Sequence, residues 1–221
     1  MNPKFIKQIL KENRPFLIPY LIFLVFAVFM MLTFSKTELH ILSNKANSPF
    51  FDFFFNYATF LGDGAMIAIL FIVLLFVKYR FAFAFLAGSL ATAVIVNIIK
   101  KVLLHDVYRP AKYFELFETY QLHFVEGVKL YSLQSFPSGH TATAFNVFLT
   151  LAILSKNNRI KLLLFVGALL VGYSRVYLSQ HFLIDITAGS VFGTLIILFF
   201  WIWFERFNKN WLEYSILKRT K

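Results

Sequence analysis

The stretch FLIPYLIFLVFAVFMMLTF, residues 16–34, runs for 19 residues without a charged side chain. A helix needs about 20 mainly apolar residues to cross the hydrocarbon core of a bilayer. Residues 81–99 and residues 186–204 form two more runs of this kind. Three shorter uncharged runs reach spanning length with their flanks, namely residues 65–77, 141–155 and 162–174. The pattern predicts an all-α integral membrane protein, a bundle of six transmembrane helices.

The composition agrees with this class. Of 221 residues, 59% are hydrophobic and 15% are charged, whereas a soluble domain carries about 25% charged residues. The chain contains no cysteine, which excludes disulfides, thiolate catalysis and cysteine metal sites. A net charge of +11 in a soluble protein would suggest nucleic acid. In a membrane protein such an excess first reports topology, so we expect a lipid bilayer and no nucleic acid as the partner.

The positive charge is predicted to lie on one side of the membrane. With six spans, residues 1–15, 78–80, 156–161 and 205–221 share a side, and they hold 14 of the 22 Lys and Arg residues with only 3 of the 11 Asp and Glu residues. The other side holds the remaining 8 basic and 8 acidic residues, so the whole surplus (14 − 3 = +11) lies on the first side. The positive-inside rule makes that side cytoplasmic. Both termini are therefore predicted inside.

The domain organisation is predicted to be simple, with a single membrane domain over residues 1–221. Residues 1–14 alternate apolar and basic side chains, as expected of an interfacial helix on anionic lipid. Residues 205–221 are predicted to form a cytoplasmic C-terminal tail. The two outer segments, residues 100–137 and 175–185, contain most of the polar side chains that could carry chemistry.

One polar segment, Phe136-Pro137-Ser138-Gly139-His140, precedes the fourth apolar run. Ser138 is a natural N-cap, so a plain capped helix would also account for it. A helix N-terminus of this kind nevertheless offers free N–H groups and a positive dipole end to an anion. His140 is expected in the first turn, beside any anion bound there.

A second polar segment contains Ser174-Arg175, His181 and Asp185. His181 and Asp185 are four residues apart and would share one face of a helix. A carboxylate in that position orients an imidazole and leaves its other nitrogen free to attack. Because Asp185 opens an apolar run, it is a functional candidate. A satisfied interfacial histidine is the alternative interpretation of His181.

The remaining segment contains Lys100, Lys101 and Arg109-Pro110. Lysines at the end of a span also fit simple snorkelling to the interface. All three segments are predicted on the outer side, where one lysine, two arginines and a protonated histidine would converge on a helix N-terminus. Such an arrangement suits a multiply charged anion, above all a phosphoryl group.

Together the three segments resemble the signature of the type 2 phosphatidic acid phosphatase superfamily, whose active-site core is shared with vanadium haloperoxidases. Pro137-Ser138-Gly139-His140 matches its second motif, and Ser174-Arg175, His181 and Asp185 match the third with the expected spacing. In the first motif, Lys101 precedes Arg109 by seven residues instead of six, which leaves Lys100 open as the alternative. The similarity covers roughly residues 58–195 and includes weaker matches in two glycine-containing segments, Leu61-Gly62-Asp63-Gly64 and Gly189/Gly193.

The resemblance implies a metal-independent reaction without a cofactor. It implies that His181 is the nucleophile, that Asp185 orients it, and that His140 is the general acid and then the base. The substrate phosphate would be bound by the side chains and backbone of Lys101, Arg109, Ser138, Gly139 and Arg175.

The expected substrate is a membrane lipid phosphate or diphosphate, hydrolysed at the outer face of the cytoplasmic membrane. Candidates are phosphatidylglycerophosphate, phosphatidic acid, undecaprenyl diphosphate and lipid A phosphate. No obligate protein partner is indicated. Two alternatives remain open: a phosphotransferase of the same fold with an acceptor other than water, and an anion transporter that uses the same basic pocket.

Overall fold

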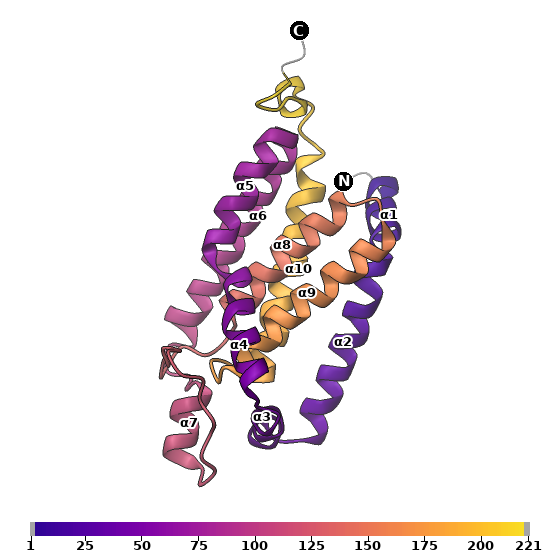
Figure 1. Cartoon of the computed structure of the whole chain (residues 1–221). Helices are drawn as coiled ribbons and strands as arrows, with labels where there is room; N and C mark the ends of the chain where they lie inside the picture. The colour runs from indigo at the N-terminus through magenta and orange to yellow at the C-terminus, as the bar shows by residue number, and fades with distance from the viewer. Residues whose placement is uncertain (1–2, 219–221) are drawn as a thin grey trace.

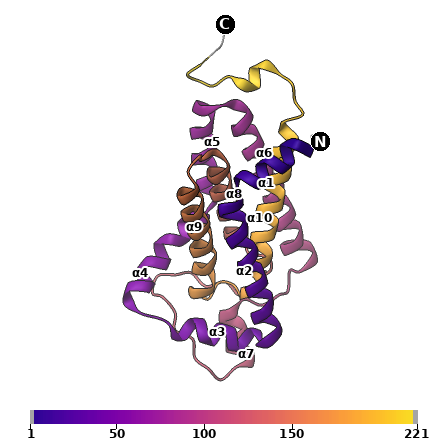
Figure 2. The same ribbon diagram turned by 90° about the vertical axis from the view of Figure 1, so that its right-hand side faces the viewer.

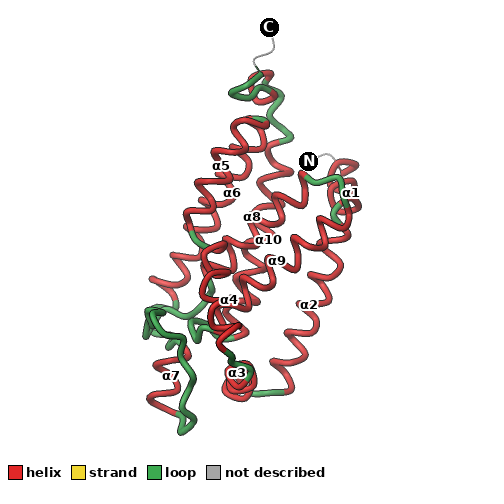
Figure 3. Tube along the Cα trace, viewed as in Figure 1, coloured by secondary structure: helices red, strands yellow, loops and turns green. Residues whose placement is uncertain are grey.

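The computed structural model describes residues 3–218, and all its regular elements are helices (Figure 3). Arg219 and Lys221, which contribute to the predicted cytoplasmic charge, lie outside the described residues. In chain order the elements are α1 (Pro3–Glu12), α2 (Arg14–Thr33), α3 (Lys36–Lys45), α4 (Pro49–Ala58), η1 (Thr59–Gly62), α5 (Gly64–Val77), α6 (Tyr79–Ile98), η2 (Ile99–Leu103), α7 (Pro110–Phe117), α8 (Gly139–Leu154), α9 (Asn158–Tyr177), α10 (Leu183–Phe204) and η3 (Asn210–Glu213).

The six predicted apolar runs coincide with α2, α5, α6, α8, α9 and α10. Four of these, α2, α6 (with η2), α9 and α10, are long and apolar enough to span a bilayer on their own. Helix α5 has 14 residues and reaches spanning length only together with α4 and η1, from which it is bent by 55°. Helix α8 has 16 residues and is shorter than the usual span. An all-α membrane protein is confirmed, and this set of helices is compatible with the predicted six spans.

Helix α8 forms the centre of the bundle and packs against α6, α9 and α10 (Figure 1). Its residues Phe145 and Leu149 are buried, and they belong to a core that includes Phe16 of α2 and Phe85 of α6. Helix α2 lies at the periphery, with Leu21, Ile22 and other large apolar side chains exposed. Because exposed apolar surface on this scale is stable only in lipid, the packing agrees with a membrane environment.

The helices place the predicted outer and inner segments at opposite ends of the bundle (Figures 1 and 2). Helix α1, the α5–α6 and α8–α9 turns and η3 lie at one end, which we call the basic end. Helices α3 and α7, and the start of α10, lie at the other. The structure therefore groups the segments as the charge count predicts.

Candidate active site

The polar segment at residues 136–140 and the segment that contains His181 and Asp185 meet where α8 and α10 begin. The backbone N–H of Ser138 donates a hydrogen bond of 3.0 Å to the backbone carbonyl of Asp185. Close packing holds the two helices together, since a Cβ on Gly189 would lie 2.4 Å from the Ser138 carbonyl oxygen. The N-terminus of α8 and the first turn of α10 thus form one unit.

His181 lies in the short loop between α9 and α10, and its side chain is buried. Its Nδ1 is 3.4 Å from Oδ2 of Asp185, without the alignment of a hydrogen bond. The same carboxylate oxygen accepts hydrogen bonds from the Ser135 hydroxyl (2.5 Å) and the Phe182 N–H (2.9 Å). Asp185 is therefore fixed by two donors beside the ring of His181.

Arg109 approaches the other side of the His181 ring. Its Nη1 lies 3.5 Å from Nε2 of His181 and also donates to the backbone and side-chain oxygens of Gln180. Its Nε donates to the carbonyl of Leu133. These neutral acceptors orient the guanidinium without forming an ion pair with it.

Arg175, in the last turn of α9, is the second buried guanidinium of the site. Its Nη1 donates to the Thr59 hydroxyl of η1 at 2.6 Å, while its Nε is buried without a hydrogen-bond partner. Its backbone carbonyl accepts from the N–H groups of Gln180 and His181. Arg175 thereby also holds the loop that carries His181.

The N-terminus of α8 also borders the site. The Ser138 hydroxyl accepts from the N–H and hydroxyl of Thr141, so it caps the helix as predicted. His140 is half-buried in the first turn, close enough to His181 for its charge to act on that ring. A cavity of about 190 Å³ between α5, α6 and α8 adjoins His140 and Gly139.

The lysine that reaches this cluster is Lys100. Its side chain is half-buried, and its charge acts on His181 and Asp185. The Lys101 side chain is exposed. The prediction that Lys101 binds phosphate stays untested, and the placement of the two side chains favours Lys100. Both lysines lie in η2, a π-helical turn.

The electrostatics of the site favour a neutral imidazole. Burial lowers the pKa of His181 well below its usual value, and the nearby positive charges of Arg109, Lys100 and Arg175 lower it further. At neutral pH the ring is therefore uncharged. A neutral ring keeps a lone pair on one nitrogen, as a nucleophile requires.

Several residues that support the site were not predicted from the sequence. His40 of α3 is buried between Phe114 and Phe182 and its Nε2 lies 3.1 Å from the hydroxyl of Ser179, in the loop that carries His181. Gln180 and Ser135 hold Arg109 and Asp185. No short motif marks these residues, because they act through contacts distant in sequence.

Within residues 3–218, no three His, Asp or Glu side chains are grouped so that they could hold a metal ion.

Comparisons with known proteins bear on the family and the fold. A search of curated protein sequences finds no significant match. Among solved structures, the crystal structure of Aquifex aeolicus LpxE matches with a TM-score of 0.64 and 28% identity, over 74% of this chain and 93% of that one. The first transmembrane PAP2 type phosphatidylglycerolphosphate phosphatase from Bacillus subtilis matches with a TM-score of 0.60 and 22% identity, over 89% and 98% of the two chains. At that identity it shows a shared fold.

The family model of the PAP2 superfamily matches residues 81–209, more than half of the chain. This range includes all three polar segments. The match decides between an enzyme and an anion transporter in favour of the enzyme, a lipid phosphatase. The chain belongs to the PAP2 superfamily.

Proposed function

We propose that this membrane lipid phosphatase transfers the phosphate of its substrate to His181 and then to water, without a metal ion. The observation that carries the proposal is the position of the His181 ring between the Asp185 carboxylate, at 3.4 Å, and the Arg109 guanidinium, at 3.5 Å. A neutral buried imidazole suits attack on a phosphoryl group when a carboxylate lies beside one ring nitrogen and a cation lies beside the other.

In the first step, Nε2 of His181 forms a bond to phosphorus, and the bond from phosphorus to the lipid oxygen breaks. His140 donates its proton to the departing lipid oxygen, which leaves as an alcohol or as a lipid monophosphate. The proton on Nδ1 of His181 stays beside Asp185, which stabilises the positive charge that the ring acquires. The product of this step is a phosphohistidine.

In the second step, the now neutral His140 removes a proton from a water molecule. The hydroxide attacks phosphorus, the bond from phosphorus to Nε2 breaks, and inorganic phosphate leaves. His181 returns to its neutral form and His140 to its protonated form. One lipid phosphate and one water are consumed, and one dephosphorylated lipid and one phosphate are released.

The phosphoryl oxygens are proposed to bind Arg109, Arg175, Lys100, and the backbone N–H of Gly139 at the start of α8, with Ser138 capping that turn. Fixed donors of this kind stabilise the charge of the transition state, and the loss of one typically lowers kcat by about 10²–10³-fold. Arg175 Nε, which is buried without a partner, is one such donor. Its proton is available to a phosphoryl oxygen.

We place the reaction at the outer leaflet, because the site lies at the ends of α8, α9 and α10 away from the basic end. At this depth the phosphate would lie at headgroup level with its lipid chains in the bilayer. Phosphatidylglycerophosphate, phosphatidic acid, undecaprenyl diphosphate and lipid A phosphate are the candidate substrates. The solved relative named as a phosphatidylglycerolphosphate phosphatase makes phosphatidylglycerophosphate the first to test.

The decisive experiment measures phosphate release from these four lipids by the purified protein, with His181→Ala as the test variant. His105→Ala, which changes an exposed histidine of the same outer region, is the matched control. We expect His181→Ala to lose all turnover and His105→Ala to keep it. With labelled lipid and a rapid alkaline quench, the wild type should yield labelled phosphohistidine.

Three outcomes would contradict the proposal. Turnover near wild type in His181→Ala would exclude this nucleophile. Loss of turnover with EDTA would show that a metal ion takes part. Delivery of the label to an added alcohol in preference to water would make the protein a phosphotransferase.

A further inference from the structure

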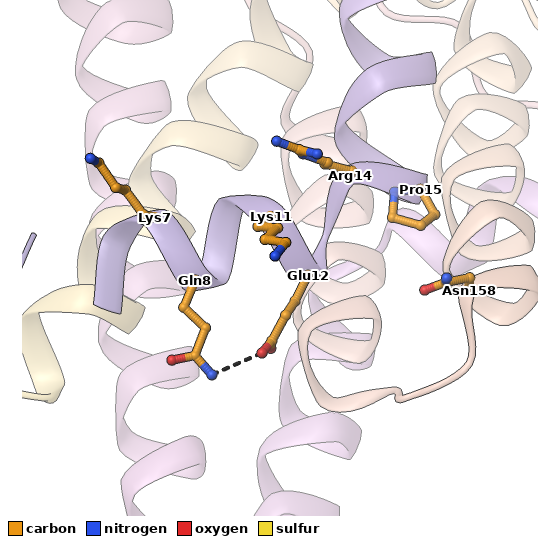
Figure 4. Close-up of a pocket in the computed structure, with 7 residues that line it drawn as sticks. All are labelled: Lys7, Gln8, Lys11, Glu12, Arg14, Pro15 and Asn158. Atoms are coloured by element: carbon orange, nitrogen blue, oxygen red, sulfur yellow. Dashed lines mark hydrogen bonds between the residues drawn. The ribbon is translucent and has the colours of Figure 1, made fainter. Parts of the chain in front are cut away.

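The basic end of the bundle carries a hollow of about 600 Å³ beside the turn between α1 and α2 (Figure 4). Three cations line it: Lys7, Lys11 and Arg14. The one carboxylate at its edge, that of Glu12, accepts a hydrogen bond from Gln8 at 2.8 Å. In Figure 4, Gln8 and Glu12 point to one side of α1, whereas Lys7 and Arg14 extend on the other. The hollow therefore suits a negatively charged group.

Buried contacts hold the α1–α2 turn, from which these exposed cations project. Lys161 of α9 donates from Nζ to the backbone carbonyl of Glu12 at 2.7 Å and to Oδ1 of Asn13 at 3.0 Å. Asn13 is buried and donates to the carbonyl of Ile9, which packs against Trp201 of α10. The α1–α2 turn is thus anchored to the bundle, and the backbone from which the cations project is preorganised.

A separate apolar groove of about 520 Å³ lies along α2. Its lining residues include Ile18, Leu21, Val25 and Phe29, which follow Arg14 at intervals of 4, 7, 11 and 15 residues. These intervals place them on the same helix face as Arg14. From Ile18 to Phe29 the helix rises by about 16 Å, which is about half of the 30 Å hydrocarbon core of a bilayer.

A cationic hollow above an apolar groove one leaflet deep matches the shape of a phospholipid. We propose that the α1–α2 turn binds one anionic phospholipid of the leaflet opposite the candidate active site. Its phosphate lies among Lys7, Lys11 and Arg14, and one acyl chain lies along α2. The apolar groove on the same helix face as Arg14 favours a bilayer lipid over a free phosphate ion, because a free ion would leave the groove unused. This lipid is bound and not hydrolysed, since it lies at the far end of the bundle from His181.

The test compares retention of phosphatidylglycerol and phosphatidylcholine by native mass spectrometry of the protein in detergent. The test variant is Lys7→Gln/Lys11→Gln/Arg14→Gln. The control, Lys156→Gln/Arg206→Gln/Lys209→Gln, removes the same charge from the same end of the bundle. We expect one phosphatidylglycerol per wild-type protein, bound in preference to phosphatidylcholine. The test variant should bind it about 100-fold more weakly, since it loses three basic groups that each attract an anionic lipid, and the control should bind it like the wild type.

Equal loss of phosphatidylglycerol from both triple variants would mean diffuse attraction and would overturn the proposal. Inorganic phosphate that competes with phosphatidylglycerol at equal concentration would also overturn it, because the site would then be an ion site. If the triple variant does not fold, Lys7→Gln/Lys11→Gln gives the same test. Hydrolysis of a short-chain lipid phosphate should be unchanged in every one of these variants, so this proposal and the proposed reaction can fail independently.

Discussion

Two arginines at opposite ends of the bundle are almost equally buried, yet their partners differ. Arg80, at the basic end, has an exposed fraction of 9%, and Arg175, in the candidate active site, 7%. Arg80 binds the Glu213 carboxylate at 2.5 Å and the backbone carbonyls of Phe204 and Phe207. Among residues 3–218, no carboxylate lies within 4.0 Å of Arg175, and its Nε has no partner.

The difference separates a structural cation from a functional one. Burying an unpaired charge is costly, so a satisfied arginine such as Arg80 stabilises the fold, whereas Arg175 holds a charge that its own protein leaves without a counter-ion. Arg109 shares this property, because its hydrogen-bond partners are neutral oxygens and an imidazole. The unpaired charges mark the end of the bundle that is built to receive an anion.

Replacement of each arginine by alanine tests this comparison directly. Arg175→Ala should lower kcat by about 10²–10³-fold with little loss of resistance to unfolding in SDS. Arg80→Ala should keep its kcat per folded molecule but lose about 1–3 kcal/mol of stability, because the carbonyls of Phe204 and Phe207 and the Glu213 carboxylate lose a charged donor. If one variant showed the larger loss in both kcat and stability, the distinction between a structural and a functional arginine would be refuted.

Lys100 and Lys101 test the same distinction between a cation at the site and a cation outside it. Lys100→Gln should lower kcat by about 10²-fold, since its charge acts at the site. Lys101→Gln, which removes an exposed charge one residue later, should change kcat by less than about threefold. Initial rates with a lipid phosphate measure both, and the reverse order would restore Lys101 as the phosphate ligand.

Substitution of Gly189, at the contact between α8 and α10, tests how far activity depends on the close packing of these two helices. A Cβ on Gly189 would lie 2.4 Å from the Ser138 carbonyl oxygen, so Gly189→Ala must displace one helix. We expect a loss of about 10- to 100-fold in kcat. In Gly64→Ala, a control with nothing within 4 Å of the new Cβ, kcat should be unchanged. Wild-type kcat in Gly189→Ala would show that the helix contact has no role in catalysis.

A dependence of stability on pH is expected from His40, a buried group that the fold keeps neutral. Burial lowers the pKa of His40 to about 4 from its usual 6.5. The unfolded chain therefore binds a proton that the folded chain does not between these values, and stability falls as pH decreases from 6.5 towards 4. The free energy of unfolding can be measured in SDS at pH 7.5 and at pH 4. Between these two pH values it should fall by about 3 kcal/mol less in His40→Gln than in the wild type. An identical loss in both proteins would contradict the assignment.

The sequence predicted the helices of the bundle better than it predicted their rotation. Apolar runs located α2, α6 and α10 because twenty uncharged residues have few other possible environments. The same runs are apolar on every face, so they do not reveal which side of a helix faces the site. The half-buried position of Lys100, in the π turn at Ile99–Leu103, could not be derived for that reason.

The candidate site was predictable to the extent that its residues lie in compact motifs. Ser138, His140, Arg175, His181 and Asp185 sit at fixed spacings beside helix ends, and the structure brings them to one place. The supporting contacts of His40 and Thr59 were not predictable. His40 contacts Ser179, 139 residues away, and Thr59 contacts Arg175, 116 residues away, and no local pattern encodes such a pairing.

The bond between Ser138 N–H and the carbonyl of Asp185 joins two backbone groups. Almost any side chain at these positions leaves it in place, and only a proline at position 138 would remove its donor. Laboratory evolution of this protein towards new lipids can therefore vary the headgroup-facing side chains widely while the spacing of α8 and α10 is inherited unchanged.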